Sequence, residues 1–451
     1  MIIKSINPYN ATIIAEYPVL SDTELEQKIQ NAHAAYKKWR VSSFEIRSQL
    51  LISVANLLHE QMHELAELCT LEMGKPISQG YAEIEKCAWL CEFYAEKAEE
   101  MLKPEMSPTE ATWSGVQYQA LGAILGIMPW NFPFWQALRF AIPAIAAGNS
   151  VLLKHASNVS GCALAMEKLL EEAGAENGLF SALMVPSSKV EAIIAHPTVR
   201  GVSFTGSDSV GSIVASQAGK YLKPCVLELG GSNPFVVLED ARLDFAIAGI
   251  LAGRFQNNGQ SCIAAKRILI QDTVFEYCFE QLESKIRNMK HGNPLEPEME
   301  IGPLAKPEFA EELYLQMKAS ETAGARIVCG GRVESAFFTP ALMIDVKPGM
   351  PVFDEETFGP LLAISTFKTL DEAIELSNNS RYGLGMAVFT SNPEQIESKL
   401  PEIEQGSVFI NNIVKSDPRL PFGGIKDSGY GRELGRDGLL SFSNRQTFVV
   451  Y

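Results

Sequence analysis

The chain has 451 residues, of which 46% are hydrophobic and 20% charged, and a formal net charge of −16. This length predicts two or three domains, and the composition is typical of a globular protein. Because the chain lacks the basic excess that neutralises phosphates, we expect neither nucleic acid nor an anionic membrane as a partner.

Residues 1–19 lack the basic start and unbroken apolar core of a signal peptide, and no long apolar run predicts a transmembrane helix. Residues 21–102 favour helices. Ser21 and Glu24 form a capping-box pattern ahead of apolar residues at helical spacing. A second helix is predicted from Ser43 to a break at residues 74–76, and another from Glu83 to Met101.

Short apolar strands alternate with helices from about residue 115, which predicts βαβ units and a mostly parallel sheet. The strands expected in the first region are Gly122–Ile127, Ser150–Lys154, Ser181–Val185, Val199–Phe204 and Cys225–Leu229. A second α/β region is expected over residues 233–420. Its predicted strands are Phe235–Leu238, Arg267–Ile270, Arg326–Cys329, Leu361–Phe367, Met386–Phe389 and Val408–Ile410.

Six short motifs follow one another along almost the whole chain. They are PWNFP (129–133), FTGSDSVG (204–211), LELGGSNP (227–234), FQNNGQSC (255–262), EETFGP (355–360) and PFGGIKDSGYGRE (421–433). Each is weak alone, but six in this order resemble the aldehyde dehydrogenase superfamily. LLKHASN (152–158) resembles a bacterial branch of its succinate semialdehyde dehydrogenases. The resemblance implies a Rossmann-type cofactor domain, an α/β catalytic domain and a small β oligomerisation element.

Oxidation of an aldehyde to an acid needs a nucleophile whose adduct can expel hydride and whose product can be hydrolysed. Cys262 suits this role, since a thiolate is strongly nucleophilic and this cysteine follows a polar loop, residues 257–261. A buried structural cysteine is the alternative, which we assign to the other seven.

Glu228 ends an apolar strand, where desolvation would raise its pKa toward that of a general base. The resemblance implies that it activates the deacylating water. The alternative is a strand-end glutamate paired with an arginine. Asn131 lies between two aromatic residues that could hold its amide, and with the main-chain N–H of Cys262 it would form an oxyanion hole. Alone, it could equally be a turn residue.

Gly206 and Ser207 stand between a predicted strand and helix, so their N–H groups could face a pyrophosphate, although the GxGxxG fingerprint is absent. The resemblance implies Lys154 at the adenine-side ribose and Glu356 with Phe358 at the nicotinamide ribose. Met128 and Trp130 are expected to line the same channel. Ser157 occupies a position where many NAD-preferring relatives carry glutamate, so NADP should be admitted besides NAD.

Arg139 follows Asn131 by eight residues, and the resemblance implies that it binds a distal carboxylate on a small-molecule aldehyde. A surface ion pair is the alternative. Trp135 and Ser261 are expected to contact the same substrate. A broad-range or CoA-acylating enzyme also stays open, although Glu228 argues against acylation of CoA.

His59 to His63 read HEQMH, the pattern of a zinc peptidase on a predicted helix. Both histidines fall opposite the apolar stripe of that helix, and a catalytic zinc needs a sheltered cleft, so no metal is expected. The eight cysteines include no CxxC pair, which suggests neither a disulfide framework nor a thiolate zinc site. A reduced, cytoplasmic setting fits best.

The expected domains are residues 1–106 with 123–230 for the dinucleotide, 231–422 for catalysis, and 107–122 with 423–451 for oligomerisation. The β-prone segment Thr112–Gln119 supports the third element. An exposed edge strand of this kind invites pairing with another subunit, so a homo-oligomer is expected, either a dimer or a tetramer.

Overall fold

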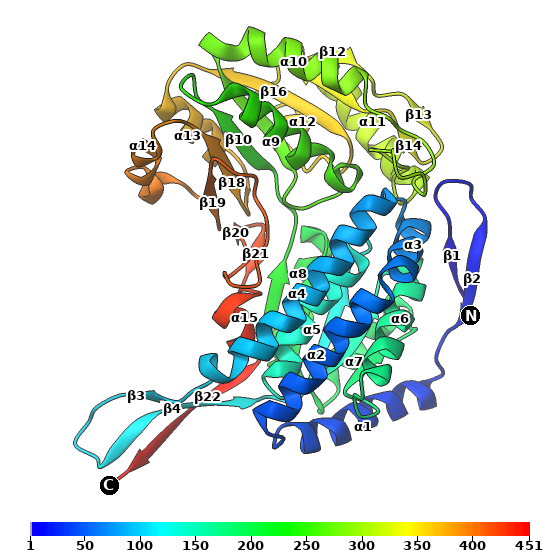
Figure 1. The fold of residues 1–451 in the computed structure, drawn as a ribbon, viewed down its shortest axis with the longest axis vertical. Helices are drawn as coiled ribbons and strands as arrows, with labels where there is room; N and C mark the ends of the chain where they lie inside the picture. Colours follow the sequence, from blue (N-terminus) through cyan, green and yellow to red (C-terminus); the bar gives the residue numbers. More distant parts are fainter. Residues whose placement is uncertain (1) are drawn as a thin grey trace.

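The computed structural model describes residues 2–451. Its two largest sheets consist mainly of parallel strands and form two α/β regions (Figure 1). In the first sheet only the edge strand β21 runs antiparallel to its neighbour. The βαβ prediction for this region is confirmed, with strand ends shifted by a few residues. The strands in spatial order are β21 (Gly429–Tyr430), β9 (Cys225–Glu228), β8 (Val199–Thr205), β5 (Ala123–Met128), β6 (Ser150–His155) and β7 (Phe180–Ala182).

Helices cover both faces of the first sheet. Side chains alternate across a strand, and neighbouring residues of β5 accordingly enter different hydrophobic clusters. Ile124 packs with α2, α4, α5 and α6, whereas Leu125 packs with α1, α7 and α8. Burial on both faces explains the continuous apolar runs of these strands. The helices are α1 (Asp22–Trp39), α2 (Phe44–Glu60), α3 (Met62–Met73), α4 (Ile77–Met101), α5 (Pro133–Ala146), α6 (Ser160–Glu172), α7 (Val190–Ala195) and α8 (Asp208–Lys220).

The amino-terminal helices confirm one boundary and correct another. Ser21 and Glu24 form the predicted reciprocal capping box at the start of α1. The single helix predicted from Ser43 is instead two helices, because Gln61 leaves the helical conformation between α2 and α3. The predicted break after α3 is present, and Gly74 stands there with a left-handed φ of 84°.

The break at Gln61 also separates the two histidines of the HEQMH motif. His59 lies in the last turn of α2, and its ring nitrogens are 3.4 and 3.5 Å from Glu85 and Glu92. His63 lies on α3, where its Nδ1 is 2.6 Å from the Tyr81 hydroxyl. Because the peptidase interpretation needs both histidines on one helix, we abandon it. Among residues 2–451, no three His, Cys, Asp or Glu side chains gather as a metal site.

The second sheet has seven strands and is likewise covered on both faces (Figure 1). Leu269 packs toward α11, whereas its neighbour Ile268 packs toward α9 and α10. Six of its strands were predicted, and β15 was missed. The seven strands in spatial order are β12 (Arg326–Cys329), β15 (Ala341–Ile344), β16 (Leu361–Phe367), β11 (Ala265–Gln271), β10 (Asn233–Val237), β18 (Met386–Phe389) and β19 (Val408–Ile410). The helices are α9 (Leu243–Phe255), α10 (Phe275–Arg287), α11 (Pro307–Thr322), α12 (Pro351–Asp354), α13 (Leu370–Asn378) and α14 (Pro393–Glu397).

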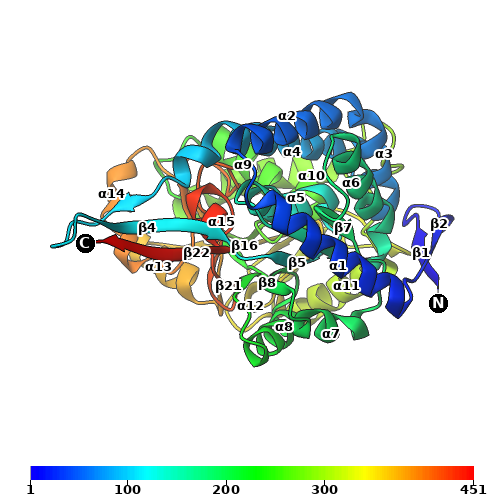
Figure 2. The ribbon, with the colours of Figure 1, turned by 90° about the horizontal axis from the view of Figure 1, so that it is seen from below.

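A three-stranded sheet projects from the body as an arm (Figures 1 and 2). It consists of β3 (Glu105–Met106), β4 (Trp113–Ala120) and β22 (Ser443–Val450), and β22 pairs with β4 along its whole length. Although the third expected domain included residues 423–451, β21 belongs to the first sheet. None of the described helices is long and apolar enough to cross a membrane.

The remaining short elements connect these parts. An amino-terminal hairpin, β1 with β2, was not predicted. The bounds are β1 (Ile2–Ile6), β2 (Ile13–Pro18), β13 (Val333–Glu334), β14 (Phe337–Phe338), β17 (Tyr382–Gly383), β20 (Ile425–Lys426) and α15 (Gly435–Leu440).

Candidate active site

Cys262 lies in the loop between α9 and β11, where two cavities meet. The first has a volume of about 410 Å³ and is named the Trp135 cavity after one of its lining residues. The second has a volume of about 300 Å³ and is named the Trp130 cavity in the same way. Since Cys262 lines both, it lies at the boundary between the two cavities.

The loop before Cys262 has a strained backbone that hydrogen bonds hold in place. Asn257, Asn258 and Gly259 are three consecutive left-handed residues, with φ of 57°, 57° and 74°. Asparagine tolerates this conformation better than most residues, and glycine adopts it freely. Asn257 Nδ2 donates to the main-chain carbonyl of Asn131 at 2.7 Å, and Asn258 Nδ2 donates to two other carbonyls. The hydrogen bond from Asn257 therefore fixes the position of the loop relative to Asn131.

Asn131 is buried and lines the Trp130 cavity. Its Nδ2 donates to the carbonyl of Gln260 at 3.0 Å. Its Oδ1 has no hydrogen-bond partner within residues 2–451. An amide nitrogen carries two hydrogens, so one N–H is free for a ligand after the bond to Gln260. The sequence suggested that aromatic neighbours hold this amide, and the structure adds a hydrogen bond from the amide to the cysteine loop.

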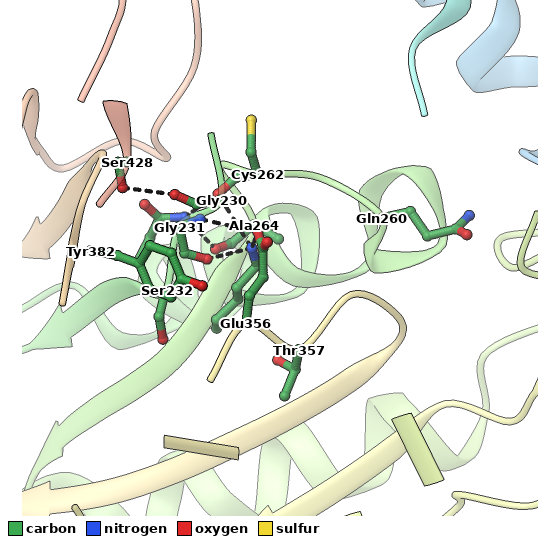
Figure 3. A network of polar contacts seen from close by, with 12 residues as sticks. Gly230, Gly231, Ser232, Gln260, Cys262, Ala264, Glu356, Thr357, Tyr382 and Ser428 are labelled. Carbon is green, nitrogen blue, oxygen red and sulfur yellow. Dashed lines mark hydrogen bonds and ion pairs between the residues drawn. The ribbon is translucent and has the colours of Figure 1, made fainter. Parts of the chain in front are cut away.

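Polar contacts fix the backbone of Cys262, while its side chain points away from them (Figure 3). Its carbonyl accepts from Asn233 Nδ2 at 2.6 Å and from Lys266 Nζ at 3.4 Å. Burial raises the pKa of the Cys262 thiol to about 11, although Arg139 and Lys266 oppose this shift with their positive charges. The thiol is therefore protonated at neutral pH and needs a proton acceptor before it can attack.

Glu228 is the last residue of β9, as predicted, and is buried. Neither carboxyl oxygen has a hydrogen-bond partner in the described part of the chain. Burial raises the pKa of Glu228 well above its usual range, and the nearby carboxylate of Glu433 raises it further. Glu228 does not line either cavity, so its side chain has to turn toward Cys262 before it can act there.

Arg139 forms a buried ion pair that the sequence analysis did not anticipate. Its Nε donates to Glu433, and its guanidinium lies 4.7 Å from the centroid of the Phe422 ring. Glu433 also accepts from Ser203 Oγ at 3.0 Å. The surface ion pair considered as an alternative is wrong, because Arg139 is only 1% exposed. Glu433 ends the last of the six motifs, but sequence spacing gave no sign that it pairs with Arg139.

The three residues expected to contact the substrate, Arg139, Trp135 and Ser261, all line the Trp135 cavity with Cys262. Its lining also contains three cationic side chains that sequence reasoning missed. They are Lys86, Lys415 and Arg419.

The Trp130 cavity contains five of the eight residues predicted for the cofactor: Trp130, Gly206, Ser207, Glu356 and Phe358. Ser207 is the N-cap of α8, where its side chain accepts from a main-chain N–H. The Trp130 ring meets the Phe358 ring edge-on at 5.7 Å. Glu356 forms an ion pair with Lys266 and accepts from the main-chain N–H of Gly231 at 3.1 Å (Figure 3).

The other three, Met128, Lys154 and Ser157, lie outside that lining. Met128 ends β5, Lys154 lies near the end of the adjacent β6, and the exposed Ser157 begins the next turn. Burial lowers the pKa of Lys154. Carboxyl ends of neighbouring parallel strands, next to a helix N-terminus, form the usual site of a dinucleotide. The residues therefore fit such a cofactor.

This fold, with a thiol between two cavities, suits an enzyme that combines a nucleophilic cysteine with a bound dinucleotide. The family model described as "Aldehyde dehydrogenase family" matches residues 1–448. The chain belongs to this family, which confirms the resemblance drawn from the six motifs.

Individual relatives are similar over their full length. A probable succinate-semialdehyde dehydrogenase [NADP(+)] of Synechocystis is 44% identical, with 100% of both chains covered. A succinate semialdehyde dehydrogenase [NAD(P)+] of Escherichia coli is 40% identical over 98% of this chain and 96% of its own. The crystal structure of a succinic semialdehyde dehydrogenase from Streptococcus pyogenes, in complex with NADP+, superposes with a TM-score of 0.97 at 36% identity and covers 99% of both chains.

Proposed function

We propose that the protein oxidises succinate semialdehyde, or a similar short aldehyde with a distal carboxylate, with NADP or NAD as the cofactor. The observation that carries this proposal is the position of Cys262 between a cavity lined by cationic side chains and a cavity suited to a nicotinamide. The printed activities of the Synechocystis, E. coli and S. pyogenes relatives support it. Broad-range oxidation of aldehydes is the alternative.

In the proposed first step, the Cys262 thiol gives up its proton to solvent water in the Trp135 cavity, and the resulting thiolate Sγ attacks the aldehyde carbon there. The carbonyl oxygen becomes an oxyanion, which the free N–H of Asn131 would stabilise together with the main-chain N–H of Cys262. Asn131 suits this role, because its bond to Gln260 fixes the amide before the substrate arrives. The product of attack is a thiohemiacetal on Cys262.

A nicotinamide dinucleotide bound in the Trp130 cavity would supply the hydride acceptor. Gly206 and Ser207 would hold its pyrophosphate at the start of α8, and Glu356 with Phe358 would hold the nicotinamide ribose. Met128 and Trp130 would line the channel between them. Lys154 and Ser157 would contact the adenine-side ribose, where a hydroxyl and an ammonium can both bind a 2′-phosphate.

Loss of hydride leaves a thioester on Cys262, which water must hydrolyse. Glu228, after losing its carboxyl proton to solvent water, would turn toward Cys262 and take a proton from the attacking water. The water oxygen then bonds to the thioester carbon, and the C–S bond breaks to release the acid and the Cys262 thiolate. The burial of Glu228 without a hydrogen-bond partner supports this role, because no contact in the described chain has to break when the side chain turns.

Steady-state kinetics test the proposal. The wild type should show a kcat/KM for succinate semialdehyde at least about tenfold above that for butanal, with measurable activity on both NADP and NAD. Cys262→Ala should lose oxidation of both aldehydes and still bind the dinucleotide, as measured by fluorescence titration. Equal kcat/KM values for the two aldehydes would contradict the substrate assignment, and turnover by Cys262→Ala would contradict the mechanism.

The proposal includes a cytoplasmic homo-oligomer. All eight cysteines are free, which suits a reducing compartment. The edge strand β22 exposes the apolar side chains of Phe448, Val449 and Val450, so a second subunit would cover them.

We also retain the three-part domain division as a proposal, with residues 429–430 assigned to the dinucleotide domain.

A further inference from the structure

We propose that Lys86 selects the substrate by forming an ion pair with the distal carboxylate of the aldehyde inside the Trp135 cavity. This inference rests on the proposed function, since it assigns the residue that recognises the carboxylate.

Lys86 is placed for this contact by a helix and by two neutral neighbours. It lies on α4 and lines the same cavity as Cys262. Its ammonium donates to Ser416 Oγ at 2.7 Å and lies 4.2 Å from the centroid of the Trp135 ring. A hydroxyl and an aromatic face can orient an ammonium but cannot neutralise it. The ammonium group is therefore fixed in the cavity with its charge uncompensated.

Three other buried cations near the site already have carboxylate partners. Arg139 is paired with Glu433, Lys75 with Glu83, and Lys266 with Glu356. For Lys86, no carboxylate of residues 2–451 lies within the 4.0 Å of an ion pair. Arg139 is therefore already neutralised, whereas Lys86 lines the same cavity without a carboxylate partner.

The surroundings of Lys86 favour the arrival of an anion. Burial lowers the pKa of Lys86 to about 8, and the positive charge of Arg139 acts in the same direction. The negative groups that face it, Asp417 and Glu83, oppose this shift, but each is already bonded to another cation. A partly desolvated ammonium gains more from a carboxylate than a solvated one does.

The other two newly found cations are less suited to direct recognition. Arg419 is exposed and bonds to Asp417 through two nitrogens. Lys415 is also exposed, so water screens its charge. Both can attract an anion to the cavity, whereas Lys86 is the half-buried cation within it.

The test compares Lys86→Met with Lys86→Arg, using Lys97→Met as a matched control on the same helix. Lys97 lies outside the cavity and pairs with Glu96 on the surface. For each variant, kcat/KM is measured with succinate semialdehyde and with butanal. In Lys86→Met the ratio of the two values should fall about ten- to a hundredfold, mainly through a higher KM for succinate semialdehyde. Lys86→Arg should keep most of the preference, and Lys97→Met all of it.

An unchanged ratio in Lys86→Met would overturn the proposal. Equal losses on both aldehydes would also overturn it, because they would show a structural role; thermal unfolding of Lys86→Met and Lys86→Arg identifies a folding defect. These outcomes are distinct from failure of the proposed function. If the wild type itself shows no preference for the carboxylated aldehyde, the function fails; if the wild type shows it and Lys86→Met keeps it, only the role of Lys86 fails.

Discussion

Glu228 combines an apolar environment with a role that needs its charge. Burial raises its pKa well above the usual range, so the fraction of ionised carboxylate that can act as a base increases as the pH rises. Deacylation should therefore accelerate with pH in the wild type. Glu228→Gln keeps the shape of the side chain but cannot accept the proton.

We expect Glu228→Gln to give one rapid turnover of reduced cofactor, followed by a stalled thioester, in a stopped-flow experiment. The slow phase should lose its dependence on pH. A steady-state rate equal to that of the wild type would show that another group activates the water.

Because Arg139 is paired with Glu433, its substitution should affect stability and activity differently from the substitution of Lys86. Arg139→Ala leaves the Glu433 carboxylate buried and unpaired next to Glu228, which should cost about 3–5 kcal/mol of unfolding free energy. Activity should fall to a similar extent on succinate semialdehyde and butanal. Urea unfolding and kinetics on both aldehydes check this. A loss of activity confined to succinate semialdehyde would show that Arg139 binds the distal carboxylate.

The sequence allowed the candidate nucleophile, Asn131 and three residues that line the Trp135 cavity to be predicted, because each lies in one of the six motifs or shortly after one. It did not reveal which charges are paired. Lys86 and its partner Ser416 are 330 positions apart, and Arg139 and Glu433 are 294 apart. Such contacts depend on tertiary packing, which short-range spacing does not encode.

Among the secondary-structure elements, the buried parallel strands were the most predictable, because burial on both faces produces continuous apolar runs. The break at Gln61 was missed, since no glycine or proline marks it. The hairpin of β1 and β2 was also missed. Its strands are largely exposed, so they lack the apolar signal of the core strands.

The turn after β6 gives a prediction about the cofactor. Ser157→Glu places a carboxylate beside the expected 2′-phosphate. Since position 157 is exposed, the repulsion is partly screened, and KM for NADP should rise only about five- to tenfold, with little change for NAD. Ser157→Ala separates loss of the hydroxyl from added charge. A wild type without activity on NADP would contradict the role of this position.

On the scale of the whole molecule, the arm of β3, β4 and β22 extends beyond both α/β regions (Figure 1). Deletion of residues 446–451 removes the exposed apolar end of β22 without touching either cavity. We expect a smaller assembly in light scattering coupled to size-exclusion chromatography. An unchanged mass would show that subunits meet elsewhere.

The meeting of two cavities at one thiol has a kinetic consequence. A carboxylate that resembles the aldehyde but cannot react would occupy the Trp135 cavity and leave the Trp130 cavity free. The inhibitor and the dinucleotide could then be bound at once, as a dead-end ternary complex. Such an inhibitor should raise the apparent KM for the aldehyde, while toward the dinucleotide it should lower Vmax and remain effective at saturation.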